Sequence, residues 1–335
     1  MKAAVVGAGS WGTAFARLLA RAGHRVVLWA RRVELADHLR ERGENPDYLP
    51  GVRLPPGVGC TAELGEALAE AEVVFLAVPS FAMAELAARV AGLLPPGVPA
   101  VHLAKGLEPQ TGRRMSEILG AALPDRPLFA LSGPSHAEEV ARDHPTAVVL
   151  AGPELRWGHR LQHDLITARF RVYLSDDLVG VEYCGAVKNV LAVGTGLADG
   201  LGYGDNTRAA LITRGLAEMV RFGRAVGARP ATFYGLAGLG DLVVTATSPH
   251  SRNRQVGLRV GQGERLADVL AGMRMVAEGV HTTEILYRKA SELGVEMPIT
   301  AAVYRVLHLG QDPRGQIDPL MLRSPKRETS GGLEE

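Results

Sequence analysis

The feature that most constrains this chain is a glycine-rich segment close to its start. The segment reads Gly7-Ala8-Gly9-Ser10-Trp11-Gly12 and directly follows the apolar run Ala3–Val6. Apolar residues at helical spacing come next. A strand, a glycine turn and a helix in this order present unpaired backbone N–H groups to a pyrophosphate. The motif alone is weak, but this context favours a dinucleotide site over a purely structural turn, with binding residues Gly7, Gly9, Ser10, Trp11 and Gly12.

The first half of the chain alternates short apolar runs with segments of helical periodicity. Continuous apolar strands separated by helices are typical of a mainly parallel sheet covered on both faces. We therefore expect an α/β fold with an N-terminal Rossmann-type dinucleotide-binding domain over residues 1–176. The runs expected to form its strands are Ala3–Val6, Val26–Trp29, Val73–Val78, Ala100–Ala104, Leu128–Leu131, Ala147–Ala151 and Phe170–Tyr173.

The second half of the chain lacks this alternation and contains no convincing strand. We expect an all-α C-terminal substrate-binding domain over residues 177–323. The charged end that contains Gly and Ser, residues 324–335, is predicted to be a flexible tail. The segments with helical periodicity are Asp177–Leu201, Asn206–Val226, Arg265–Gly272, Thr282–Leu293 and Ile299–Leu309.

Composition argues against several classes of partner. A formal net charge of +1 gives no general attraction to nucleic acid. No apolar run reaches the roughly 18 residues of a membrane span, so we expect no membrane insertion and a soluble, cytoplasmic protein. Cys60 and Cys184 are far apart, which fits a reducing compartment. His159 and His163 have metal-ligand spacing but no third ligand, so no metal site is predicted.

The end of the second apolar run indicates the type of cofactor. A site selective for NAD places an acidic residue there to bind the ribose 2′-hydroxyl. Here Val26–Trp29 leads into Ala30-Arg31-Arg32, so two guanidinium groups are available for a 2′-phosphate. The alternative is a solvated arginine pair that opens the next helix. We therefore expect Arg31 and Arg32 to favour NADP(H), with NAD(H) as the other cofactor that the site accepts.

Ligands of an open parallel sheet gather at the carboxyl ends of its strands. Lys105 follows Ala100–Ala104, and Ser132-Gly133-Pro134-Ser135 follows Leu128–Leu131. Lysine is rare among the 37 basic residues, which favours a ligand contact for Lys105 over a plain surface role. Ser135 and Glu138 have capping-box spacing, which alone would explain both. The same helix start also suits an anion or a substrate hydroxyl.

Lys188 lies in the first expected helix of the C-terminal domain. The spacing of this segment places Lys188 on one helical face with Val181, Gly185, Ala192 and Thr195. Its closest neighbours on that face are small, so a ligand has room to reach the amine. The periodicity leaves two alternatives open: the side chain extends to solvent, or it faces a cleft.

A second glycine-rich segment precedes a candidate phosphate site. It runs from Gly235 to Asp241, and Ser251-Arg252-Asn253-Arg254 follows. A helix start that combines a hydroxyl, an amide and a bidentate guanidinium suits a phosphate group. An ordinary helix cap with solvated arginines explains the same residues.

Taken together, these segments resemble bacterial NAD(P)-dependent glycerol-3-phosphate dehydrogenases, from about residue 3 to about residue 310. The resemblance implies interconversion of dihydroxyacetone phosphate and sn-glycerol 3-phosphate for phospholipid synthesis, in a cytosolic protein that is often a homodimer. The segments that carry it are Gly-Ala-Gly-Ser-Trp-Gly-Thr-Ala, Lys105-Gly106, Ser-Gly-Pro-Ser, Glu-Tyr-Cys-Gly-Ala-Val-Lys-Asn-Val, Gly-Leu-Gly-Asp-Leu, Ser-Arg-Asn-Arg and Val276-Ala277-Glu278-Gly279-Val280.

The resemblance also implies roles for individual residues. Lys188 matches the general base. The implied substrate positions are Lys105, Gly133, Ser135, Lys188, Asp241, Ser251, Arg252 and Asn253. The implied cofactor positions are Ser10, Trp11, Arg31, Lys105, Ala137, Arg252, Val276 and Glu278.

Two residues depart from the family pattern, and two other functions compete. His136 stands where an aromatic or apolar residue is usual, and Ala246 where cysteine is common, which puts pocket detail in question. One competing function is a two-domain NADP-dependent hydroxyacid or ketopantoate-type dehydrogenase; the phosphate-suited segment from Ser251 argues against it. The other is a non-catalytic NADPH-binding sensor, which Lys188 and Asp241 argue against.

Overall fold

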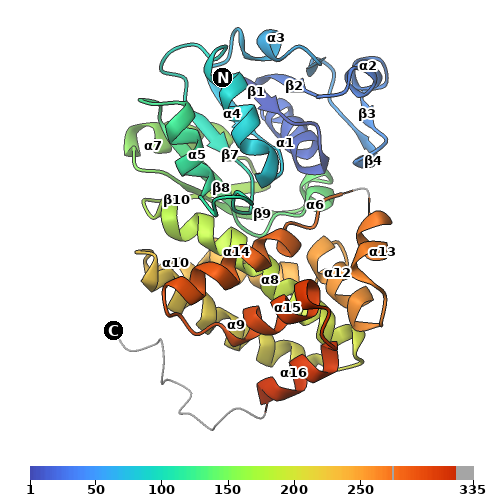
Figure 1. Ribbon diagram of the computed structural model, residues 1–335. Helices are drawn as coiled ribbons and strands as arrows, with labels where there is room; N and C mark the ends of the chain where they lie inside the picture. The colour runs from blue at the N-terminus through green and yellow to red at the C-terminus, as the bar shows by residue number, and fades with distance from the viewer. Residues whose placement is uncertain (274, 322–335) are drawn as a thin grey trace. The chain divides into compact units, whose positions relative to one another are not determined.

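The computed structural model describes residues 1–273 and 275–321 (Figure 1). The chain divides into two compact units. Unit 1 consists of Met1–Glu108 and Arg113–Leu178, and unit 2 of Pro109–Gly112 and the chain from Val179 onward. The expected tail, residues 324–335, lies outside the described residues, as do the last two residues of the expected C-terminal domain.

Unit 1 is built on an eight-stranded sheet with the order β10-β9-β8-β7-β6-β1-β2-β5. Every neighbouring pair is parallel except β8 with β9, which is antiparallel. The expectation of a mainly parallel α/β sheet is confirmed. The strands are β1 (Lys2–Val6), β2 (Arg25–Trp29), β5 (Gly59–Thr61), β6 (Val73–Leu76), β7 (Ala100–His102), β8 (Leu128–Ser132), β9 (Thr146–Ala151) and β10 (Phe170–Ser175).

Helices cover both faces of this sheet, which explains its continuous apolar strands. Successive residues of β1 belong to different cores: Ala3 and Val5 share one with Phe15, and Ala4 and Val6 share the other with Leu86. The helices of unit 1 are α1 (Ser10–Arg21), α2 (Val33–Arg42), α3 (Leu64–Leu68), α4 (Met83–Ala91), α5 (Met115–Ala122), α6 (Ala137–Ala141) and α7 (Leu155–Leu165) (Figure 1).

Sequence analysis missed three short strands of unit 1. Two of them, β3 (Glu44–Asn45) and β4 (Leu49–Arg53), pair as an antiparallel hairpin, and the third is the edge strand β5. They lack a clear pattern because β3 has only two residues and β4 contains Pro50 and Gly51. Tertiary contacts define this hairpin instead. The buried side chain of Asn45 donates hydrogen bonds to Ala8 O at 2.9 Å and Thr13 Oγ1 at 2.7 Å.

The described part of unit 2 contains helices and no strand. Helix α8 is apolar almost throughout, and residues 180–198 are all buried, as expected of a helix surrounded by others. The elements are α8 (Leu178–Gly200), α9 (Asp205–Ala225), α10 (Pro230–Tyr234), a π-helical turn (Leu236–Gly240), α11 (Asp241–Thr247), α12 (Arg252–Gly261), α13 (Leu266–Ala271), α14 (Glu278–Glu292), α15 (Pro298–Leu309) and α16 (Pro313–Met321) (Figure 1).

Helices α8 and α12 touch backbone to backbone through glycines. A Cβ atom on Gly196 of α8 would lie 2.1 Å from Arg254 O. A Cβ atom on Gly257 of α12 would lie 2.1 Å from Val193 O. Side chains at either position would force the helices apart, so these glycines fix how the two helices pack.

Glu218 provides a second fixed point in unit 2, at the start of α15. Its buried carboxylate accepts hydrogen bonds from Ile299 N at 2.5 Å and Thr300 N at 3.2 Å. These are first-turn N–H groups, which have no partner within their own helix. Burial raises the pKa of the Glu218 carboxyl to about 7, although these hydrogen bonds act to lower it.

We expect Glu218→Gln to remove part of the pH dependence of stability. The folded-state pKa of about 7 lies above the ordinary value of 4.5. The folded protein therefore binds more protons between these values, and its stability falls as pH rises through them. Because Gln does not titrate, the unfolding free energy of the wild type minus that of the variant should decrease by at most roughly 3 kcal/mol between pH 5 and pH 8. Urea denaturation of both proteins measures this difference, and an unchanged difference would contradict the assignment.

Candidate functional site

The glycine loop in unit 1 has the geometry of a dinucleotide cradle. Gly7 has φ +119°, and a Cβ atom there would lie 2.5 Å from Ala77 O. A Cβ atom on Gly12 would lie 1.8 Å from Gly7 O. The loop follows β1, whose neighbours β2 and β6 lie on opposite sides of it. This reversal of strand order is where such sheets bind ligands.

The start of α1 is open to a ligand. Gly9 is the N-cap residue, in an extended conformation, and no atom lies within 4 Å of the position that its Cβ would take. Ser10 and Trp11 form the first turn, which contains no acidic residue. A helix N-terminus of this kind attracts phosphate through its unpaired N–H groups and its dipole. The loop therefore fits the expected cofactor.

Arg31 and Arg32, which sequence analysis treated as a pair, have different environments in the structure. Arg31 is exposed, and among the described residues it has no hydrogen-bond or ion-pair partner. Arg32 is the N-cap residue of α2, and its guanidinium is bonded to Asp47. That hydrogen bond raises the pKa of Arg32 further above its usual value.

Lys105, Gly133 and Ser135 lie together in unit 1, at the ends of β7 and β8. Lys105 Nζ donates to Gly133 O at 2.7 Å and to Ser135 Oγ at 3.4 Å. The φ of Gly133 is +130°, a conformation that favours glycine. Ala137, another expected cofactor position, is the first residue of α6.

The expected capping box of Ser135 and Glu138 is wrong. The N-cap residue of α6 is His136, with no side-chain cap. Ser135 Oγ donates to Gly133 O at 2.8 Å instead of accepting from the helix. The left-handed turn at Gly133 brings its carbonyl within reach of the hydroxyl, and sequence spacing does not reveal this. The hydroxyl therefore belongs to the Lys105 cluster.

Lys188 is buried in unit 2, so the alternative in which it extends to solvent is wrong. Its Nζ donates to Asp241 Oδ1 at 2.8 Å and to Thr245 Oγ1 at 2.6 Å. The side chains of Lys188 and Asp241 are only 6% and 2% exposed. A charge pair so deeply buried is costly to desolvate, which marks Lys188 and Asp241 as candidates for a functional site.

Sequence analysis missed Thr245. Its hydroxyl accepts from Lys188 and donates to Asp241 O at 2.6 Å. The available signal was the four-residue spacing from Asp241, which places both on one face of α11. The neighbouring Ala246 is completely buried.

The segment from Ser251 combines a cap with contacts to the next part of the site. Ser251 Oγ accepts from Arg254 N at 3.2 Å and so caps α12, as one alternative expected. Arg252 Nη1 donates to Val276 O at 2.9 Å. Asn253 Nδ2 donates to Asn189 Oδ1 at 2.9 Å, and its Oδ1 accepts from Gly279 N at 2.8 Å.

These contacts gather the expected residues of unit 2 around two helix starts. Val276 and Glu278 lie at the start of α14, Arg252 at the start of α12. Asn253 bridges both starts to Asn189, the neighbour of Lys188 on α8. The phosphate candidates and the lysine are thus linked within one unit.

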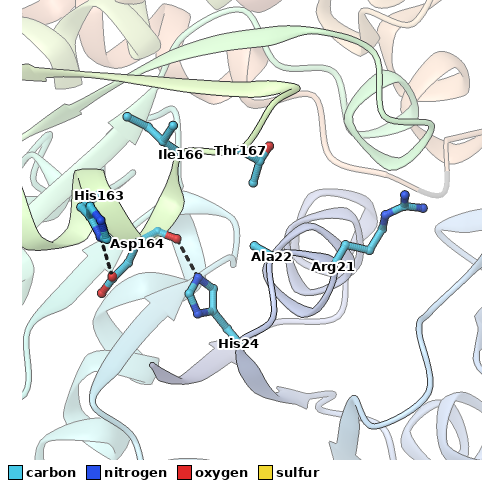
Figure 2. Close-up of a pocket in the computed structure, with 7 residues that line it drawn as sticks. All are labelled: Arg21, Ala22, His24, His163, Asp164, Ile166 and Thr167. Atoms are coloured by element: carbon cyan, nitrogen blue, oxygen red, sulfur yellow. Dashed lines mark hydrogen bonds and ion pairs between the residues drawn. The ribbon is translucent and has the colours of Figure 1, made fainter.

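A hollow elsewhere in unit 1 does not include any expected site residue. It has a volume of about 390 Å³ and is lined by Arg21, Ala22, His24, His163, Asp164, Ile166 and Thr167 (Figure 2). His24 Nε2 lies 2.6 Å from Asp164 O, and His163 Nδ1 lies 3.3 Å from Asp164 Oδ1 (Figure 2). Among the described residues no group of three or more His, Cys, Asp or Glu side chains is placed to hold a metal ion.

Comparisons with known proteins cover both units. The family described as NAD-dependent glycerol-3-phosphate dehydrogenase matches with its N-terminal model at residues 2–157 and its C-terminal model at residues 177–318. The chain is 51% identical to glycerol-3-phosphate dehydrogenase (NAD(P)+) of Geobacter metallireducens and covers 98% of each chain. It is 50% identical to the Chlorobium limicola protein of the same name, over 98% of this chain and 99% of the other.

Solved structures agree with this result. Glycerol-3-phosphate dehydrogenase of Coxiella burnetii superposes with a TM-score of 0.93 at 40% identity, over 96% of this chain and 99% of the other. A ketopantoate reductase of Ralstonia eutropha superposes with a TM-score of 0.63 at 19% identity, over 96% of this chain and all of the other. The second likeness shows a shared fold alone.

Gly9→Ala and Gly12→Ala should separate cofactor binding from folding. The added methyl group of Gly12→Ala meets Gly7 O, so we expect a loss of stability of about 1–3 kcal/mol. Gly9→Ala has open space, and its weaker cap is offset by the less flexible unfolded chain. Its melting temperature should stay near that of the wild type, while NADPH binding weakens about tenfold or more because backbone approach to the pyrophosphate is blocked.

Thermal unfolding and fluorescence titration with NADPH measure the two effects. Wild-type affinity in the Gly9→Ala protein would show that the pyrophosphate does not approach this residue. Equal destabilisation by both substitutions would show that the loop is a structural turn.

Proposed function

Because the chain belongs to the NAD-dependent glycerol-3-phosphate dehydrogenase family, we propose that it interconverts sn-glycerol 3-phosphate and dihydroxyacetone phosphate. NADP(H) is the favoured cofactor, and NAD(H) is also accepted. The observation that carries the proposal is the buried Lys188, hydrogen-bonded to Asp241 and Thr245. A non-catalytic sensor has no need for a buried ion pair of this kind, which is costly to desolvate.

Lys188 moves the proton of the reaction. When bound, the nicotinamide supplies or accepts the hydride. In the reducing direction the Lys188 ammonium donates a proton to the carbonyl oxygen of the substrate, and in the oxidising direction the amine takes the hydroxyl proton. Asp241 and Thr245 hold Nζ in one position, so the transfer needs little reorganisation.

The start of α12 binds the substrate phosphate. Ser251 shapes this start through its cap, and Arg252 supplies a bidentate guanidinium. In unit 1, the family resemblance implies substrate positions at Lys105, Gly133 and Ser135. A phosphate held at one end of a three-carbon substrate fixes the position of its carbonyl carbon, which converts binding energy into orientation.

The substrate anion distinguishes this function from the ketopantoate-type alternative. A spectrophotometric assay should show oxidation of NADPH, and to a smaller extent NADH, with dihydroxyacetone phosphate, and much slower oxidation with ketopantoate. No oxidation of either cofactor with dihydroxyacetone phosphate would overturn the proposal. Faster turnover of ketopantoate would favour the alternative.

The proposal also covers the cellular location of the protein and the kinds of partner that it binds. Cys60 and Cys184 are both free thiols and buried, which fits a cytoplasmic protein. The near-neutral net charge supports a small-molecule phosphate substrate rather than nucleic acid. None of the described helices has the length and apolar character needed to cross a bilayer. A homodimer and a role in phospholipid synthesis complete the proposal.

Substitution of Lys188 should abolish turnover while cofactor binding survives. Lys188→Ala alone leaves the Asp241 carboxylate buried without its cation, which costs about 3–5 kcal/mol. The double variant Lys188→Met with Asp241→Asn removes both charges at similar volume and is the better test. We expect kcat to fall by about a hundredfold to ten-thousandfold, with the Kd for NADPH within about twofold of wild type.

Stopped-flow turnover and NADPH titration measure the two quantities in the same preparation. Turnover near the wild-type rate would show that Lys188 is structural. Loss of NADPH binding along with turnover would show that the pair maintains the fold rather than the chemistry.

A further inference from the structure

We propose that Asp47 sets the preference of the site between NADPH and NADH, by engaging the guanidinium of Arg32 that a 2′-phosphate would otherwise bind. The inference rests on the proposed function, because it concerns the same cofactor site. It gives a role to a carboxylate outside the glycine loop and outside the segment that follows β2.

The contacts of Arg32 are the first observation. Its Nη2 atom is bonded to Asp47 Oδ2, and its guanidinium lies 5.9 Å from the centre of the Tyr48 ring, in cation–π contact. The Arg32 and Asp47 side chains are 47% and 40% exposed. The pair is therefore formed in the free protein but remains open to exchange with a ligand. Arg31, the preceding residue, is exposed and has no such partner among the described residues.

The position of Asp47 is fixed by the glycine loop itself. Asp47 lies in the turn between β3 and β4. Asn45, at the start of this turn, donates to Ala8 O of the glycine loop and to Thr13 Oγ1 of α1. Asn45 Oδ1 accepts from Tyr48 N at 3.1 Å, which closes the turn. The carboxylate is thus held beside Arg32 by an anchor that is part of the cofactor cradle.

The charges explain the effect on specificity. The Asp47 carboxylate offsets the positive charge of the Arg32 guanidinium to which it is bonded. A phosphate monoester carries close to two negative charges. Because Asp47 engages Nη2 of Arg32, the 2′-phosphate of NADPH must compete with the carboxylate for this guanidinium, whereas the 2′-hydroxyl of NADH displaces no ion. Asp47 therefore weakens NADPH binding selectively and brings the two affinities closer together.

The test replaces the carboxylate with a neutral group of the same shape. We expect Asp47→Asn to tighten binding of NADPH and of 2′,5′-ADP about three- to fivefold, the range of an exposed ion pair. Binding of NADH and 5′-AMP should change less than about twofold. Asp37→Asn is the matched control, because Asp37 forms a similar exposed pair with Arg40 at 2.8 Å on α2. Melting temperatures establish that each variant is folded.

A double-mutant cycle with Arg32→Ala decides the mechanism. If Asp47 acts by engaging Arg32, Asp47→Asn has no effect on 2′,5′-ADP binding in the Arg32→Ala background. An equal gain in both backgrounds would overturn the proposal, because Asp47 would then act by direct repulsion of the phosphate. No gain in the wild-type background would also overturn it.

The binding readout is independent of turnover, so the two proposals fail separately. Absence of dihydroxyacetone phosphate reduction, with the Arg32-dependent gain in 2′,5′-ADP affinity intact, would overturn the proposed reaction and leave the role of Asp47 standing. Normal turnover without the gain would do the reverse.

Discussion

The buried ion pair between Lys188 and Asp241 is the interaction on which unit 2 depends. Helix α8 is buried along most of its length, and a lysine ammonium in its middle is unfavourable unless an acidic side chain pairs with it. Asp241 does so as the first residue of α11, directly after the π-helical turn. A Cβ atom on Gly238 in that turn would lie 2.1 Å from Phe233 O. The glycines before Asp241 therefore allow the close backbone packing that places its carboxylate beside Lys188.

The glycine contact between α8 and α12 extends this arrangement to the candidate phosphate site. Gly196 and Gly257 allow the two backbones to touch, so the start of α12 has a fixed position relative to Lys188. Asn253 adds a hydrogen bond to Asn189, next to the lysine. Residues 65 positions apart in the sequence, such as Lys188 and Asn253, thus act within one rigid framework. Close packing fixes the position of α12 relative to α8, because a helix held by backbone contacts has little freedom to shift.

The sequence predicts those features that depend on local pattern. Strands buried on both faces read as continuous apolar runs, and the glycine motif has a fixed place between a strand and a helix, so the sheet and the glycine loop at the end of β1 could be foreseen. The position of Lys105 after a strand was also sufficient to place it near Ser135, because the parallel strands β7 and β8 end at one edge.

Features that depend on distant partners could not be foreseen. Helical periodicity could not decide whether the Lys188 side chain extends to solvent or faces a cleft, because its partner Asp241 is 53 residues away. The capping-box spacing of Ser135 and Glu138 was misleading, since the left-handed turn at Gly133 offers the hydroxyl a nearer acceptor. The Arg32–Asp47 pair was hidden for the same reason, because the β3–β4 hairpin is defined by Asn45 and not by an apolar pattern.

The two ion pairs differ in what their surroundings allow. The pair in unit 2 is almost fully buried, so each charge depends on the other and a ligand cannot displace either without a large cost. The pair in unit 1 is nearly half exposed, where water and salt weaken the attraction and a phosphate competes on similar terms. A buried pair therefore suits a group that must hold one position through every turnover. An exposed pair suits a residue whose partner changes with the cofactor. The degree of burial of each ion pair therefore agrees with the role that we propose for it.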